Sequence, residues 1–393
     1  MVSRRTLLEL IGASAATCAA PRLALAAAQT DARFVLVLLR GAVDGLALAP
    51  PYADARYREY RGALALDAPG HAPGSMLDLD GHFGLHPAFT EVYARFLQRE
   101  ALIVHAVASP YRERSHFDGQ DLLESGARDV GLLRDGWLNR SLAALPGATA
   151  IALARNAPLV LRGAAPVTSW APSRLPDADD ATLDRLQRLY AGDEFFATRL
   201  EQALRSQDIA GGMGESRYRR GNEAQQFGEL MHSAARFLVA PDGARIAVAE
   251  FGGWDTHANQ GAADGQLANR FAALDEGLRR LREGLGNSWS DTVVLAVTEF
   301  GRTVRVNGTR GTDHGTGAAA LMLGGAVAGG RVVTDWPGLG ALYEDRDLAP
   351  TTDLRSLFKS VLIEHLGVPA RHIEQDVFPD SARARPLRDL VST

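Results

Sequence analysis

The sequence has almost no cysteine. Cys18 is the only one among 393 residues, so the chain after residue 18 has no thiol. A chain without thiols forms no disulfide, has no cysteine nucleophile and binds no metal through thiolate. Any nucleophile or metal site must therefore use hydroxyl, carboxylate and imidazole groups.

Long hydrophobic runs and blocks of positive charge are also missing. After residue 30 no apolar run is long enough to cross a bilayer, which predicts a mature chain with no membrane span. The net charge is −5 without a basic block, which argues against nucleic acid as a partner. A content of 46% hydrophobic and 23% charged residues is ordinary for a globular protein of one large or two smaller domains.

Residues 1–28 are predicted to be a signal peptide of the twin-arginine type. The paired Arg4 and Arg5 precede a moderately apolar stretch that ends in small residues up to Ala28, an ending that suits a signal peptidase. The alternative is an amphipathic helix, but Pro21 fits processing better. We therefore expect a periplasmic or secreted protein that passes through the twin-arginine export machinery. That route carries folded proteins and is often used with cofactors, an indirect hint of a bound metal.

Short apolar runs that alternate with helical patterns predict the fold. The predicted strands are 34–39, 102–107, 149–154, 246–249, 292–297 and 318–323, and the clearest helices are 267–285 and 352–367. This alternation is typical of an α/β fold with a mainly parallel sheet and helices on both faces.

One segment departs from this rhythm. Residues 178–240 form charged helical patterns joined by a glycine-containing stretch, and we interpret them as a helical insertion in a single domain of residues 29–393. The insertion is either a lid or a structural helical layer.

Polar side chains cluster where the predicted strands end. They are Asp44, then Ser109, Arg112, Arg114, Ser115, His116 and Asp118, then Asp255 and His257, then Glu299 and Arg302, and last Asp313 and His314. Parallel strands would bring these groups to one edge of the sheet, where ligands bind in open α/β folds. Carboxylates and imidazoles together suit a divalent cation such as zinc, manganese or calcium.

The stretch "FGGWDTHANQG" is the strongest of these signals. Asp255 and His257 leave a buried strand through two glycines, which lets both side chains reach one ion. The alternatives are structural: Asp255 could cap the following helix, Asp44 could belong to a turn and Ser115 could be a helix cap.

Longer motifs carry a resemblance to a known family. "LVLLRGAVDGL", "IVHAVASPYRERSHFDGQD", "GGWDTHANQG" and "VTEFGRTVRVNGTRGTDHGTG" together resemble the exported bacterial family of domain of unknown function 1501, from about Phe34 to Val377. That family is similar in fold to the alkaline phosphatase and sulfatase superfamily. The resemblance implies an alkaline phosphatase-like α/β domain.

The superfamily pattern implies roles for individual residues. Asp44 matches a metal ligand after the first strand, and Ser115, or else Ser109, matches a nucleophile at a helix start. One metal site is matched by Asp255, His257 and His314.

The sequence departs from the superfamily pattern at the second metal site. An adjacent Asp-His pair usually follows a long apolar strand, but Glu299 and Phe300 stand there in this chain. Asp313 and His314 could supply the pair instead, at the expense of the first site.

Two functions follow. The first is a metal-dependent hydrolase of phosphate or sulfate esters, acting on a small anionic ester or glycan, with Ser115 as nucleophile and Arg112, Arg114 and Arg302 neutralising charge. Its pool of metal ligands is Asp44, Asp255, His257, Glu299, Asp313 and His314. The alternative is a non-catalytic exported binding protein that keeps a phosphatase-like fold with a degenerate metal site.

Overall fold

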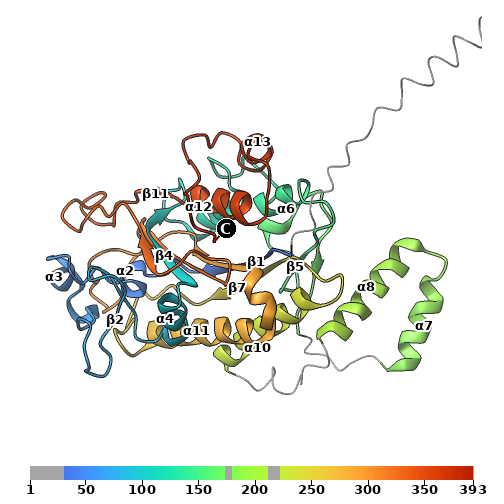
Figure 1. Ribbon diagram of the computed structural model, residues 1–393, viewed down its shortest axis with the longest axis horizontal. Coiled ribbons are helices and arrows are strands. Elements are labelled where there is room, and N and C mark those ends of the chain that lie inside the picture. Colours follow the sequence, from blue (N-terminus) through green and yellow to red (C-terminus); the bar gives the residue numbers. More distant parts are fainter. Residues whose placement is uncertain (1–30, 173–178, 211–221, 393) are drawn as a thin grey trace, which may run out of the picture. The chain divides into compact units, whose positions relative to one another are not determined.

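The computed structural model (Figure 1) describes residues 31–172, 179–210 and 222–392. The expected signal peptide at residues 1–28 lies outside the described residues, as do two stretches within or beside the expected insertion, 173–178 and 211–221. Among the described helices none is long and apolar enough to span a membrane.

A nine-stranded sheet contains all six predicted strands. They are β1 (Arg33–Arg40), β4 (Ala101–Ala108), β5 (Ala150–Ala152), β7 (Ile246–Gly252), β8 (Thr292–Thr298) and β9 (Ala318–Leu323). The short strands β6 (Thr168–Ser169), β10 (Arg331–Val333) and β11 (Thr352–Asp353) complete it. The order is β10-β4-β9-β8-β1-β7-β5-β6 with β11 beside β4, and β9 alone runs antiparallel to its neighbours.

Helices cover both faces of the sheet, as predicted (Figure 1). On one face Val35 and Val37 of β1 pack toward α4 (Thr90–Leu97), α10 (Glu223–Val239) and α11 (Gln266–Leu285). On the other, Leu36 and Leu38 share a buried cluster with α6 (Trp137–Leu142) and α12 (Leu354–Ser360). Because both faces of the central strands are buried, these strands read as continuous apolar runs. The predicted α/β class with a mainly parallel sheet is confirmed.

The remaining elements are short. They are α2 (Gly45–Leu48), α3 (Tyr57–Arg61), α5 (His116–Ser125) and α13 (Ala370–His372), 3₁₀ turns at Gly62–Leu64, Leu159–Leu161 and Gly286–Asp291, π turns at Val361–His365 and Ile373–Val377, and a separate antiparallel pair of β2 (Leu77–Asp78) and β3 (Gly84–Leu85). The predicted helix 352–367 is therefore shorter: Asp353 caps α12 at the Arg355 N–H, and the helix passes into the first π turn after Ser360.

The expected insertion contains three described helices, α7 (Asp180–Tyr190), α8 (Glu194–Ala210) and α10. Phe227 and Met231 of α10 are buried among the residues of α11, and Asn222 caps the start of α10 with a capping box. At the α7–α8 connection Leu189 and Phe195 are exposed. Helix α10 is thus part of the helical layer that supports the sheet.

Helix α12 carries the only lysine of the chain. Among the 42 lysine and arginine residues, Lys359 alone is a lysine, and its side chain is fully buried. Its ammonium group donates to Glu374 at 2.6 Å and to the Ser381 carbonyl at 3.0 Å. A buried ammonium group requires such partners because an unpaired charge is costly to bury.

Candidate metal centre

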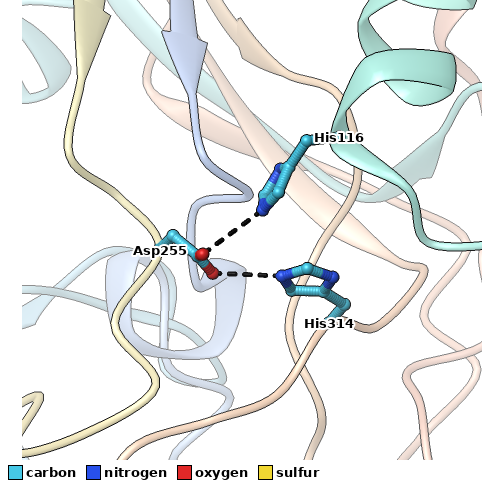
Figure 2. A group of neighbouring side chains, drawn as sticks. All are labelled: His116, Asp255 and His314. Atoms are coloured by element: carbon cyan, nitrogen blue, oxygen red, sulfur yellow. Dashed lines mark hydrogen bonds and ion pairs between the residues drawn. The ribbon is translucent and has the colours of Figure 1, made fainter.

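Loops at one edge of the sheet bring together His116, Asp255, His257 and His314. His116 opens α5, which follows β4, while Asp255 and His257 follow β7. His314 precedes β9, and because β9 runs antiparallel its start lies at the same edge as the ends of its parallel neighbours. Figure 2 shows His116 and His314 pointing at the two oxygens of Asp255 from different elements.

Three atoms of this group lie in mutual contact. Asp255 Oδ1 is 3.0 Å from His257 Nε2 and 3.1 Å from His314 Nε2, and the two Nε2 atoms are 3.1 Å apart. Ligands at zinc distances of ~2.0–2.1 Å in a tetrahedral site are about 3.3 Å from one another. The spacing of these three atoms is close to that value.

The protons of the two imidazoles point away from this contact. His257 Nδ1 donates to Asp313 Oδ1 at 3.0 Å, and His314 Nδ1 donates to the Arg114 carbonyl at 2.8 Å, since neither oxygen has a proton to give. In a neutral ring the Nε2 atom then carries a lone pair. Two lone-pair nitrogens and a carboxylate oxygen face each other, an arrangement that calls for a cation between them.

The same arrangement is the one metal-binding histidines adopt. A ligating imidazole usually donates its other N–H to a carboxylate or backbone carbonyl, which fixes the ring. Asp313 and the Arg114 carbonyl do this for His257 and His314. The residues present therefore fit a divalent metal ion.

His116 borders this set. Its Nδ1 is 2.8 Å from Glu299 Oε1, while its Nε2 lies 3.4 Å from Asp255 Oδ2, is shielded from solvent and makes no hydrogen bond among the described residues (Figure 2). Ligand atoms of His116, Asp255 and His314 lie within 4.8 Å of one another. The triad of Asp255, His257 and His314 is tighter, and His116 lies at its border, beside the second oxygen of Asp255.

Arg302 supplies a buried positive charge beside the triad. Its guanidinium group bonds to Asp255 Oδ1 and to the carbonyl and hydroxyl of Thr312, and its side chain is inaccessible to solvent. Burial raises the pKa of Asp255, but Arg302, His257 and His314 outweigh it and hold that pKa below its usual value. Burial also lowers the pKa of His314. The charged carboxylate and neutral imidazole are the forms that bind metal.

Glu299 and Phe300 occupy the place where the second metal site was expected. Glu299 is buried and accepts from His116, from the Gly41 N–H at 2.8 Å and from Thr298. Burial raises the pKa of Glu299, and these hydrogen bonds lower it below its usual value. Phe300 is buried and stacks on His116 with ring centres 5.1 Å apart. Glu299 orients His116, and Phe300 supports it.

Asp44 lies outside the group. Its carboxylate accepts from the Leu46 and Ala47 N–H groups at the start of α2 and from Gln260 at 2.7 Å, and it forms an ion pair with the buried Arg61. The side chain of Gln260 also accepts from the Thr312 hydroxyl, and this hydroxyl accepts from Arg302. Because Arg302 bonds to Asp255, Asp44 is linked to Asp255 through a buried chain of hydrogen bonds.

Three other candidates also point elsewhere in the described residues. Ser115 donates its backbone N–H to the Tyr111 hydroxyl at 3.0 Å, and its side chain lies beside the same hydroxyl. Arg112 donates to the Ser109 and Tyr111 carbonyls. Arg114 pairs with Glu344 and Asp347, and only its carbonyl meets the group, at His314.

Sequence reasoning overlooked several residues. His116 was noted among the polar residues, but the role at that helix start was assigned to Ser115. Gly41 was not considered, although a Cβ there would lie 2.9 Å from the Asp255 backbone nitrogen. Its position directly after β1, facing the exit of β7, is the one signal that the sequence offers for it.

The fold and site define an α/β protein with a candidate metal centre at the carboxyl edge of a mainly parallel sheet. A family model described as "Protein of unknown function (DUF1501)" matches residues 86–377, and the chain belongs to this family. No curated protein matches the sequence.

Solved structures that resemble the chain share little sequence with it. A phosphonate monoester hydrolase of Agrobacterium radiobacter is 12% identical, over 86% of this chain and 74% of that one, with a TM-score of 0.40. The C-terminal periplasmic domain of EcEptC from Escherichia coli, in complex with Zn, is 10% identical over 92% of both chains with a TM-score of 0.43. The lipoteichoic acid synthase LtaP from Listeria monocytogenes is 10% identical, over 89% and 75%, with a TM-score of 0.37.

Proposed function

We propose that this protein is an exported, metal-dependent hydrolase of phosphate or sulfate esters, with Asp255, His257 and His314 as the metal ligands. The observation that carries the proposal is the convergence of three lone-pair atoms whose imidazole protons all point outward. Three protein ligands with an open fourth position are typical of catalytic rather than structural zinc. Asp255 and His257 keep 40% and 45% of their side chains exposed, which leaves that position accessible to an ester.

The surrounding residues have separate tasks in this proposal. A bound divalent cation would polarise the ester and stabilise the charge of the transition state. Arg302 holds Asp255 in place and adds a fixed positive charge close to the reacting group. Glu299 raises the pKa of His116 through their hydrogen bond, so the imidazole can carry a proton beside the second oxygen of Asp255.

Metal content is the first test. We expect about one divalent ion per chain, by plasma mass spectrometry, in protein purified without chelator. The double variant Asp255→Asn, His257→Ala should lose it. The matched control Asp67→Asn, His71→Ala changes an exposed carboxylate and an exposed imidazole elsewhere, and it should keep the metal. Equal metal content in both variants would contradict the ligand assignment.

Hydrolysis is the second test. Metal-loaded protein should cleave 4-nitrophenyl phosphate, bis(4-nitrophenyl) phosphate or 4-nitrophenyl sulfate, and chelation should abolish the activity with recovery on adding metal back. A protein that binds stoichiometric metal but cleaves none of these esters is not the hydrolase proposed.

A second candidate function is favoured by one observation. The Ser115 hydroxyl, the nucleophile implied by the family resemblance, lies beside the Tyr111 hydroxyl and makes no hydrogen bond to the triad within the described part of the chain. A non-catalytic exported binding protein with one metal ion has no need of a nucleophile. Metal binding without hydrolysis of any ester would select this function.

A further inference from the structure

A polar groove lies beside the candidate metal centre. It has a volume of about 580 Å³ and runs between α5 and the loop that follows β5. Phe117, Gln120 and Glu124 line it from α5, and Arg155 and Arg162 face them from the other side. A cavity of this size accommodates a small organic molecule.

The groove and the metal centre share one wall. Gln120, which lines the groove, donates to Glu299 Oε1 at 3.3 Å, and the same oxygen accepts from His116. His116 and Gln120 are one helical turn apart on α5, a rise of roughly 6 Å. The groove therefore lies next to the residues that orient His116.

The floor of the groove is rigid. Arg40 bonds to Glu124 at 2.8 Å and to Glu250 at 3.0 Å, and Glu124 also accepts from the Val160 N–H at 3.0 Å. These bonds tie β1, β7, α5 and the 3₁₀ turn at Leu159–Leu161 together. The charges of the floor are thus used within the protein, and its shape is fixed before a ligand arrives.

The other polar side chains that line the groove have hydrogen-bonding groups available for a ligand. Arg155 is exposed and has no hydrogen-bond or ion-pair partner in the described part of the chain. Arg162 uses only its Nε, on the Ala157 carbonyl. Since the Gln120 amide nitrogen is bonded to Glu299, its oxygen remains as an acceptor. Phe117 is 88% exposed and offers an apolar ring face.

This chemistry selects one class of ligand. Three arginines are balanced by Asp121, Glu124 and Glu250, so the groove does not attract a polyanion as such, and its many charged groups disfavour an acyl chain. A sugar fits instead: each hydroxyl both donates and accepts, which matches the guanidinium groups of Arg155 and Arg162 and the amide oxygen of Gln120. The apolar C–H face of a pyranose can lie on an exposed aromatic ring such as Phe117.

We propose that this groove binds the sugar unit of the substrate, so that the protein acts on a phosphate or sulfate ester of a sugar or glycan. The inference rests on the proposed hydrolase function and names its substrate class. Arg155 and Phe117 are specificity residues in it, since they contact the sugar and not the ester.

The test compares sugar esters with esters that lack a sugar. We measure kcat/KM for the 6-phosphates or 6-sulfates of N-acetylglucosamine, glucose and galactose. Each value is divided by kcat/KM for the matching 4-nitrophenyl ester. Wild type should favour at least one sugar ester, and Phe117→Ala and Arg155→Ala should each lower that ratio at least tenfold. The control Arg185→Ala, Phe195→Ala removes an exposed arginine and an exposed phenylalanine from α7 and α8, and it should leave the ratio unchanged.

The failure of this inference can be separated from failure of the hydrolase. If the esters are cleaved but the groove variants leave the ratio as it is in wild type, the sugar site is overturned while the hydrolase stands. If no ester is cleaved, titration calorimetry with N-acetylglucosamine and its trimer decides. Binding that is lost in both groove variants supports the sugar site, and wild type that binds neither sugar overturns it.

Discussion

Two pairs of histidines differ in what their two ring nitrogens contact. In His86 and His105, Nε2 donates to a backbone carbonyl and Nδ1 accepts from a backbone N–H, so both nitrogens are used. In His257 and His314 one nitrogen donates outward, and the other faces the triad. This difference distinguishes the two structural histidines from the two candidate ligands.

The buried His105 should make stability depend on pH. Burial lowers its pKa from 6.5 to about 4, because a charged imidazole in the core would lose its hydration. Above pH 6.5 both folded and unfolded states hold a neutral ring. Below it the unfolded state takes up the proton first, so the free energy of unfolding falls by about 1.4 kcal/mol per pH unit down to pH 4.

Urea unfolding of the wild type and His105→Gln measures this. At pH 7.5 the wild type should be the more stable, and by pH 4.5 its advantage should shrink by about 2–3 kcal/mol. The exposed His71→Gln serves as a control without such a change. An advantage that stays constant over this range is inconsistent with a neutral His105.

Ser115 and Asp255 should differ in how much the hydrolysis depends on them. Ser115→Ala removes a hydroxyl that lies beside Tyr111 and makes no described hydrogen bond to the triad, so we expect kcat/KM for 4-nitrophenyl phosphate or sulfate to change less than about threefold. Asp255→Asn removes a ligand charge and should reduce it at least about a hundredfold. A hundredfold loss in Ser115→Ala would instead support the nucleophile that the family resemblance implies.

The sequence predicted residue types at this edge better than it predicted their contacts. The structure brings Asp255, His257 and His314 together, because the loops after β7 and before β9 lie at one edge of the sheet. The sequence also predicts Glu299 and Asp313 as ligands, whereas in the structure their carboxylates accept from His116 and His257. Which way an imidazole nitrogen points depends on side-chain rotation, and no spacing in the sequence encodes it.

At the scale of elements, the metal centre depends on a close backbone contact between the loops that follow β1 and β7. Gly41 follows β1 with φ of +120° and lies against the backbone of Asp255, which follows β7. Its N–H donates to Glu299 at the exit of β8. Three neighbouring strands thus meet at one glycine.

Replacing this glycine should disturb the centre. In Gly41→Ala the added Cβ would come within 2.9 Å of Asp255 N, so the loop must shift and the triad should lose its metal. Gly62→Ala is a matched control, since Gly62 also has positive φ but has no atom within 4 Å of the added Cβ. Plasma mass spectrometry on both folded variants tests this. Equal metal content in the two variants would show that metal binding does not require the close contact between Gly41 and Asp255.

The direction of β9 could not be predicted from its sequence. The apolar pattern of a buried strand is the same whether the strand is parallel or antiparallel to its neighbours. Strand β9 is antiparallel to β8 because the chain reverses direction between them, and His314 lies in the segment that makes this reversal. The short strands β2, β3, β6 and β11 also escaped prediction because two residues carry no periodicity.

At the scale of the whole molecule, export is a prediction of the N-terminal sequence alone. Replacing Arg4 and Arg5 by lysine should leave an uncleaved precursor in the cytoplasm, because the paired arginines are what a twin-arginine signal presents. N-terminal sequencing of the wild-type exported protein should begin at Gln29. The same distribution and the same N-terminus in both proteins would contradict a twin-arginine route.

The burial of Lys359 has a practical consequence. With its ammonium group enclosed between Glu374 and the Ser381 carbonyl, the folded protein presents no lysine amine to solvent. Reagents that acylate amines should therefore modify a single place, the α-amino group at the start of the chain. A fluorophore or a sensor surface coupled by this chemistry would be attached to every molecule at the same end.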